Sequence, residues 1–205
     1  MCVQRQQHQG VAVSRKFLVR LIVLAGWSVV GLAAQSRVTV TFTSAGKDPK
    51  FDAAVDEYRR IWAAEGSRII EAMERITSLE FPDKKIKAEI YEGTSFSGRG
   101  NAPMRFRASY LAEEKKGTLV HELGHRMNAQ IRTRPQDLDE HRLLFLYLYD
   151  LYVDLYGKEF ADREVEFGKT LKGLYDYEGA WNWALAMSRE ERLSRFAEVL
   201  KTNRK

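Results

Sequence analysis

Cysteine is nearly absent from this chain of 205 residues, since the only one is Cys2. The residues beyond the N-terminal segment therefore have no thiol, which excludes disulfide bonds, thiolate metal ligands and a cysteine nucleophile there. Long apolar runs are also missing. The run Leu21–Ala34 has 14 residues, fewer than the roughly 20 that cross a bilayer comfortably. Stability must come from a packed core, which the remaining residues are numerous enough to form.

Acidic residues are absent from the first 33 positions, and this explains the basic character of the chain. The formal net charge is +5, and Arg5, Arg15, Lys16 and Arg20 contribute four of these charges, so the remainder carries +5 − 4 = +1. Nucleic-acid binding domains carry a concentrated basic surface, often with interleaved aromatic residues. The nearly neutral remainder does not favour a nucleic-acid partner.

The N-terminal segment has the order of features of a secretory signal peptide. A positive stretch ends at Arg20, the apolar run Leu21–Ala34 follows, and the small residues Gly31, Ala33 and Ala34 close it. We therefore expect an exported protein, periplasmic, extracellular or envelope-associated, with residues 1–34 as leader and residues 35–205 as one domain. The alternatives are an uncleaved anchor, which would be the only membrane contact expected, and a buried first helix of the domain.

The hydrophobic periodicity predicts an α+β fold with a helical C-terminal half. Alternating apolar residues predict three short strands that form a small mixed sheet, and apolar residues at helical spacing predict a long N-terminal helix and five later ones. The glycine- and serine-rich segment Gly93–Asn101 is expected to be a loop, with a possible role as a lid. The expected strands cover 38–42, 86–91 and 104–110, and the expected helices 51–78, 112–131, 137–156, 159–174, 177–187 and 188–200.

The segment His121-Glu122-Leu123-Gly124-His125 matches the pattern H-E-x-x-H within one of these helices. Residues four apart lie on the same face of a helix, so the imidazoles of His121 and His125 can converge on one metal ion. Glu122 can then take a proton from a water on that metal, whose pKa zinc lowers to about 7. Gly124 would allow another backbone or the metal to approach the helix closely.

This motif, together with the order of a long helix, strands, motif helix and further helix over residues 51–156, resembles the zincin superfamily of zinc metallopeptidases. The resemblance implies Zn²⁺ as cofactor, a peptide or protein substrate, and peptide-bond hydrolysis with Glu122 as the catalytic base. It also implies a strand, 104–110 or 86–91, that pairs with extended substrate. Tyr110, Tyr175 and Tyr177 are candidates for stabilising the oxyanion.

A catalytic zinc site takes three protein ligands and one water, so a third ligand is needed. Ile131 stands where metzincins have their third histidine, and that pattern is absent. The gluzincin pattern instead draws an acidic ligand from the next helix, and Asp150-x-x-x-Asp154 resembles it, with Asp150 as the ligand and Asp154 orienting a histidine. His141 is the rival, and Glu140 a further candidate.

Asp150 and His141 are nine residues apart, a rotation of about 900°, and so cannot both face the metal. A plainer interpretation pairs both aspartates with arginine or lysine from the C-terminal helices, because a buried carboxylate needs a partner. Two other functions also fit the sequence. The first is a non-catalytic, zinc-stabilised binding domain of the envelope, and the second is a zinc hydrolase of non-peptide amides.

Overall fold

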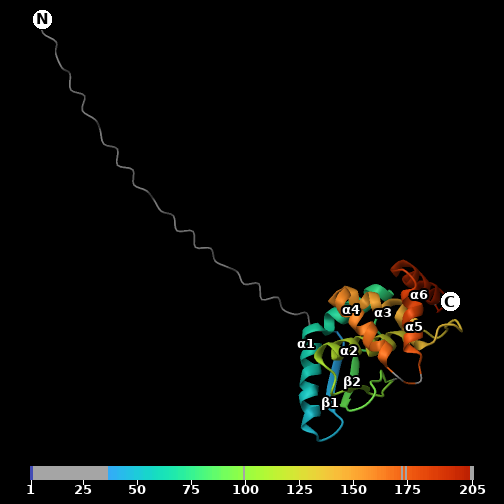
Figure 1. Cartoon of the computed structure of the whole chain (residues 1–205). Helices are drawn as coiled ribbons and strands as arrows, with labels where there is room; N and C mark the ends of the chain where they lie inside the picture. The colour runs from blue at the N-terminus through green and yellow to red at the C-terminus, as the bar shows by residue number, and fades with distance from the viewer. Residues whose placement is uncertain (2–36, 99, 172, 174, 204–205) are drawn as a thin grey trace. The chain divides into compact units, whose positions relative to one another are not determined.

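The computed structural model describes residues 1, 37–98, 100–171, 173 and 175–203. The expected leader at 1–34 lies outside the described residues, Met1 excepted. The chain forms three strands and six helices within the described residues, so the α+β class is confirmed. Figure 1 shows the strands beside a helical C-terminal half. The elements are β1 (Thr39–Ser44), α1 (Pro49–Thr77), β2 (Lys85–Tyr91), β3 (Met104–Arg107), α2 (Ala112–Asn128), α3 (Glu140–Tyr156), α4 (Lys158–Thr170), α5 (Tyr177–Leu185) and α6 (Arg189–Asn203).

The sheet has the order β1-β2-β3, and both of its strand pairs are parallel. This corrects the expected mixed sheet. Helix α1 connects β1 to β2, and such a crossover returns the chain in the same direction. The described residues of the link from β2 to β3 form no helix. Within it, Phe96 forms an isolated antiparallel bridge with Arg105 of β3.

One face of the sheet is buried. In β1 the buried positions alternate with exposed threonines, and in β2 they alternate with Lys85, Lys87 and the half-buried Glu89. The buried face packs against α1 through an aromatic cluster. The Tyr58 ring lies 5.9 Å from the ring of Phe42 in β1 and 5.0 Å from that of Phe106 in β3, measured between ring centroids.

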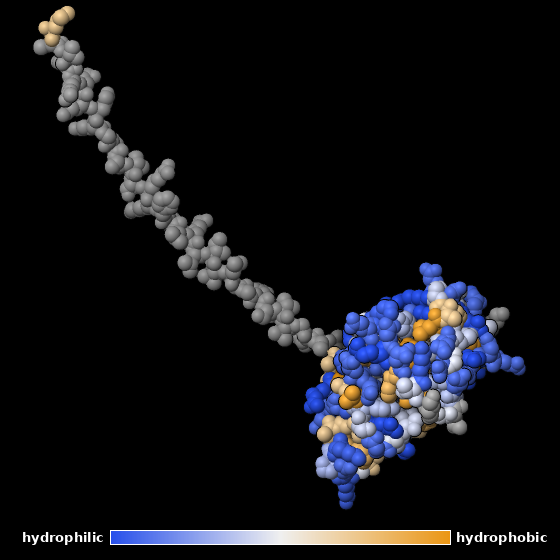
Figure 2. Space-filling model, viewed as in Figure 1, coloured by the Kyte–Doolittle hydropathy of each residue, from blue (hydrophilic) through white to orange (hydrophobic). Residues whose placement is uncertain are grey.

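Helix α3 is the centre of the helical half, because it packs against α1, α2, α4, α5 and α6. Its residues are buried on nearly every side, which confirms the buried central helix that its apolar composition predicts. No helix among the described residues is long and apolar enough to span a membrane. Accordingly, the face of the molecule shown in Figure 2 is mostly hydrophilic, with only scattered apolar patches.

The helix ends follow local signals in the sequence. Asp139 caps α3 by accepting hydrogen bonds from the backbone N–H groups of His141 and Arg142, at 2.9 and 2.8 Å. Gly157 ends α3 with a φ of 87°, which glycine adopts without strain. At the start of α6, Ser188 and Glu191 form the reciprocal capping box that their spacing predicts. The Asp139 cap matters most, since it fixes the first turn of α3, where the candidate site begins.

Candidate metal centre

Three imidazoles converge between α2 and the first turn of α3. His121 and His125 are one turn apart on α2, and their Nε2 atoms lie 3.1 Å from each other. His141 comes from α3, with its ring centroid 5.5 Å from that of His121 and 4.8 Å from that of His125. One ring nitrogen from each residue lies within 4.8 Å of the other two, which is close enough to hold a metal ion.

The donor set fits a metal of the zinc type in three respects. A tetrahedral ion with bonds of about 2.0–2.1 Å holds its nitrogen ligands roughly 3.3–3.4 Å apart, near the separation of His121 and His125. His141 Nδ1 is buried and has no hydrogen-bond partner among the described residues. Burial lowers the pKa of His141 to about 4, against a smaller opposing effect of Asp139 and Glu140.

Burial and the two neighbouring histidines also lower the pKa of His121. The imidazoles of His121 and His141 are therefore neutral at physiological pH, and the neutral form is the one that binds metals. His141 is buried, whereas His121 and His125 are partly exposed. A ligand from solvent can therefore approach the pair on α2 more readily than His141.

Aromatic rings surround His141. The ring centroids of Tyr175 and Tyr177 lie 4.4 and 4.6 Å from that of His141, and that of Phe145 lies 5.8 Å away. Burial, followed by the charge of Glu122, raises the pKa of Tyr177 to about 12. Of the three tyrosines suggested by the sequence, the structure brings Tyr175 and Tyr177 to the histidines. The ring of Tyr110 packs instead on Phe167, at 5.5 Å.

Glu122 follows His121 on α2 and is 7% exposed. Its carboxylate makes no hydrogen bond and no ion pair with the part of the chain that the structure describes. Burial raises the pKa of its carboxyl group to about 8. A divalent cation held by the adjacent histidines would favour the ionised form and so oppose this shift.

Asp150, the third ligand expected from the sequence, lies outside this cluster of histidines. Its carboxylate is buried, and Arg192 of α6 donates three hydrogen bonds to it, of 2.8, 2.9 and 3.0 Å. The rotation along α3 explains the outcome, because His141 faces α2 and Asp150 points to another side of the helix. His141 replaces Asp150 as the candidate third ligand.

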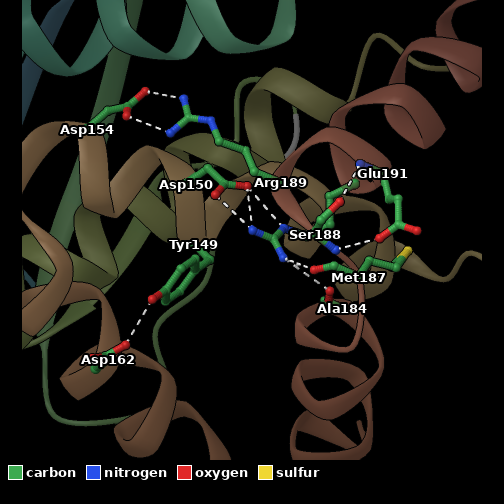
Figure 3. A network of polar contacts seen from close by, with 10 residues as sticks. Tyr149, Asp150, Asp154, Asp162, Ala184, Met187, Ser188, Arg189 and Glu191 are labelled. Atoms are coloured by element: carbon green, nitrogen blue, oxygen red, sulfur yellow. Dashed lines mark hydrogen bonds and ion pairs between the residues drawn. The ribbon is translucent and has the colours of Figure 1, made fainter.

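The neighbouring aspartate is also used in an ion pair. Asp154 accepts two hydrogen bonds of 2.9 Å from Arg189 (Figure 3), and the two side chains are 30% and 47% exposed. Asp154 therefore does not orient His121 or His125. Glu140, the remaining candidate from the sequence, lies outside the three-histidine group, and its carboxylate is 3.9 Å from the guanidinium of Arg134. Both aspartates thus pair with arginines of the C-terminal helix.

Close packing between α2 and α3 holds the two halves of the cluster together. A Cβ atom added at Gly124 would lie 2.5 Å from Leu144 Cδ1, so the group that approaches this glycine closely is a side chain of α3 and not another backbone or the metal. The Tyr147 hydroxyl oxygen lies 3.1 Å from the Gly124 carbonyl and 3.1 Å from Asn128 Oδ1, so its one proton is shared between these two acceptors. The Tyr152 hydroxyl donates to the Gly117 carbonyl at 2.9 Å.

A cavity of about 500 Å³ lies beside His125. One wall is the segment around Gly98 and Gly100, which belongs to the loop expected from the sequence. Arg126 anchors this loop by donating to the Ser97 and Gly100 carbonyls at 2.9 and 3.3 Å. Nothing in the sequence singled out the loop anchor or the cavity, because both depend on contacts between distant segments.

The strand expected to pair with substrate is partly covered. Phe96 and Arg105 exchange two backbone hydrogen bonds, of 2.7 and 2.9 Å, at the edge of β3 away from β2. β2 itself lies between the other two strands. An extended peptide therefore meets no open strand edge at Arg105.

Comparison with known proteins found no match for the chain among family models, curated proteins or solved structures. The interpretation of the three histidines therefore rests on their arrangement and chemistry.

Proposed function

We propose that this protein is a zinc-dependent hydrolase of peptide bonds, with His121, His125 and His141 as the metal ligands and Glu122 as the catalytic base. The observation that carries the proposal is that one ring nitrogen from each of three histidines, two of them one turn apart within H-E-x-x-H, lies within 4.8 Å of the other two. Because no family model matches the chain, the proposal rests on the arrangement and chemistry of these residues alone.

The composition of the cluster favours a catalytic site over a closed structural one. Structural zinc sites have four protein ligands, whereas catalytic sites have three and leave a position for water or substrate. Within the described ranges the group contains three histidines and no carboxylate. The partial exposure of His121 and His125 and the adjacent cavity leave room for substrate, which a zinc-stabilised binding domain would not require.

The side chains around the cluster suggest a division of roles. A bound zinc ion would supply a Lewis acid for the scissile carbonyl and a water of lowered pKa. Glu122 would accept a proton from the water whose oxygen bonds to the carbonyl carbon, and would pass that proton to the amine nitrogen as the C–N bond breaks. The neutral hydroxyl of Tyr177, beside His141, is available to donate a hydrogen bond to negative charge that develops on the substrate.

The experiment that tests this function compares Glu122→Gln with the zinc-loaded wild-type protein. The variant should keep one zinc ion per chain, measured by elemental analysis, and should cleave a diverse peptide mixture at least about 100-fold more slowly, because it loses the base. Glu113→Gln is the matched control, since Glu113 is an exposed residue of the same helix. Full activity in Glu122→Gln would refute the assigned base.

The third ligand is tested by His141→Ala. Replacing residues that only support a metal ligand weakens binding about 10- to 100-fold, so loss of an imidazole ligand should weaken zinc binding by about 100-fold or more. Competition with a chelator measures this affinity. A wild-type protein that binds no transition metal, or a His141→Ala variant with unchanged affinity, would contradict the proposed centre.

A further inference from the structure

The ring of Tyr175 carries an inference that rests on the proposed function and extends it to the substrate side chain beside the scissile bond. Tyr175 lies between α4 and α5. Its ring centroid is 4.4 Å from that of His141 and 6.2 Å from that of Tyr177. The Tyr175 ring therefore borders the candidate metal centre directly.

Tyr175 lies at the boundary between the buried imidazole of His141 and solvent, because His141 is 5% exposed whereas Tyr175 is 44% exposed. Single exposed apolar residues are common on protein surfaces. Apart from Met1, the large apolar side chains exposed in the described part of the chain are those of Phe96, Leu111 and Tyr175. Tyr175 is distinguished from the others by its ring contact with a histidine of the cluster.

The ring is within reach of a substrate bound at the metal. A zinc ion bound by His141 lies roughly 3 Å from the centre of that imidazole. Together with the 4.4 Å between the two rings, this puts the ion no more than roughly 8 Å from the Tyr175 ring centroid. Because one extended residue spans about 3.3–3.6 Å, a side chain next to the scissile bond can contact this ring.

Neither neighbouring ring lies flat against Tyr175. The interplanar angles are 59° with His141 and 72° with Tyr177. The Tyr175 ring, which is exposed to solvent as well, thus keeps surface on which a ligand can stack. Aromatic rings attract one another in offset-stacked or edge-to-face arrangements, beyond the effect of the apolar area that they bury.

We propose that Tyr175 is a specificity-determining residue of the proposed hydrolase, and that its ring packs against an aromatic side chain of the substrate residue next to the scissile bond. Phenylalanine, tyrosine and tryptophan side chains match it best. Alanine, glycine and serine are too small to cover the ring.

Ligands anchored on the metal test this subsite without requiring cleavage. The zinc-loaded protein is titrated with the N-acetylated hydroxamates of phenylalanine and of alanine, and calorimetry gives the two dissociation constants. In both probes the hydroxamate group chelates the ion, so their difference reports on the side chain. The phenylalanine derivative should bind about 3- to 10-fold more tightly, as expected for one aromatic pair.

Three substitutions link this preference to the ring. Tyr175→Ala should lower the ratio of the two dissociation constants to below about 2, because the aromatic pair is lost. Tyr175→Phe keeps the ring and should keep the wild-type ratio. Leu111→Ala is the matched control, since Leu111 is also exposed but lies at the start of α2, about 15 Å along the helix from His121. It should leave the ratio unchanged.

The ratio also separates recognition of substrate from simple shielding of His141. If Tyr175 only kept water away from His141, Tyr175→Ala would weaken zinc binding, measured by competition with a chelator. It would then affect both hydroxamates equally and leave their ratio at the wild-type value. That result would overturn the role in specificity.

The outcomes also distinguish this inference from the proposed function. Equal binding of the two hydroxamates to the wild-type protein would overturn the subsite even if the protein cleaves peptides. The expected ratio in a zinc-loaded protein that cleaves no peptide would support the subsite and reject the hydrolase. A protein that binds no zinc would reject both.

Discussion

Replacing Asp150 with asparagine distinguishes a structural aspartate from a metal ligand. Asp150 is 3% exposed and Arg192 is 4% exposed, and three bonds of 2.8–3.0 Å join them. The substitution preserves the shape of the side chain and removes its charge. The guanidinium of Arg192 is then left buried without a counter-ion, although the Ala184 and Met187 carbonyls still accept from it.

Removing one partner of a buried ion pair costs about 3–5 kcal/mol. For a protein of this size, 1 kcal/mol corresponds to about 2–4 °C in the melting temperature, so Asp150→Asn should melt about 6–20 °C below the wild-type protein. Zinc content and zinc affinity of the folded variant should be unchanged. Thermal unfolding followed by circular dichroism, together with elemental analysis of the folded sample, measures both quantities.

Asp154→Asn is the matched control. Asp154 lies one turn further along α3 and is also held by two bonds from an arginine, but this pair is partly exposed. Exposed ion pairs contribute about 0–1 kcal/mol, so the control should lower the melting temperature by no more than about 4 °C. An Asp150→Asn variant that keeps wild-type stability but loses zinc would refute the assignment and restore Asp150 as a ligand.

Two further substitutions test the packing around α2. Burial, followed by the charges of two nearby glutamates, raises the pKa of Glu164 to about 8. In the unfolded chain the same carboxyl group ionises near pH 4.5. The wild-type protein therefore loses stability from this group as the pH rises from about 4.5 through 8. At pH 9, Glu164→Gln should raise the free energy of unfolding, measured by denaturant titration, by roughly 2–4 kcal/mol, and below pH 4.5 it should make little difference. Glu166→Gln, at an exposed position, should leave the free energy of unfolding unchanged at both pH values. Gly124→Ala, whose methyl group meets Leu144, should lower the free energy of unfolding by about 1–3 kcal/mol. Gly173→Ala is its control, because no atom lies within 4 Å of the added carbon. Equal free energies of unfolding for the two variants would argue against close contact between α2 and α3.

Much of the fold could be predicted from local patterns. The expected helix 51–78 corresponds to α1 at Pro49–Thr77, and the expected strand 86–91 to β2 at Lys85–Tyr91. Helical and alternating periodicities report which faces of an element are buried. They do not report the direction of a neighbouring strand, and for this reason the parallel arrangement of the sheet escaped prediction.

The third histidine of the cluster could not be chosen from the sequence because α3 is apolar nearly all round. In an amphipathic helix the apolar stripe indicates which side faces the core, but α3 offers no such stripe. Its orientation depends on where its few polar residues find partners. The partner of Asp150 is Arg192, 42 residues further along the chain, and no local pattern connects the two.

The charges of the candidates explain why His141 and not Asp150 reaches the cluster. A carboxylate buried in a low-dielectric interior needs a cation, and α6 supplies Arg192 in a geometry that occupies both oxygens of Asp150. An imidazole can instead be buried in its neutral form, which is what the lowered pKa of His141 indicates. Its Nδ1 atom has no hydrogen-bond partner among the described residues. Satisfying Asp150 with an arginine on one side of α3 thus leaves the opposite side free to present a neutral nitrogen ligand to α2.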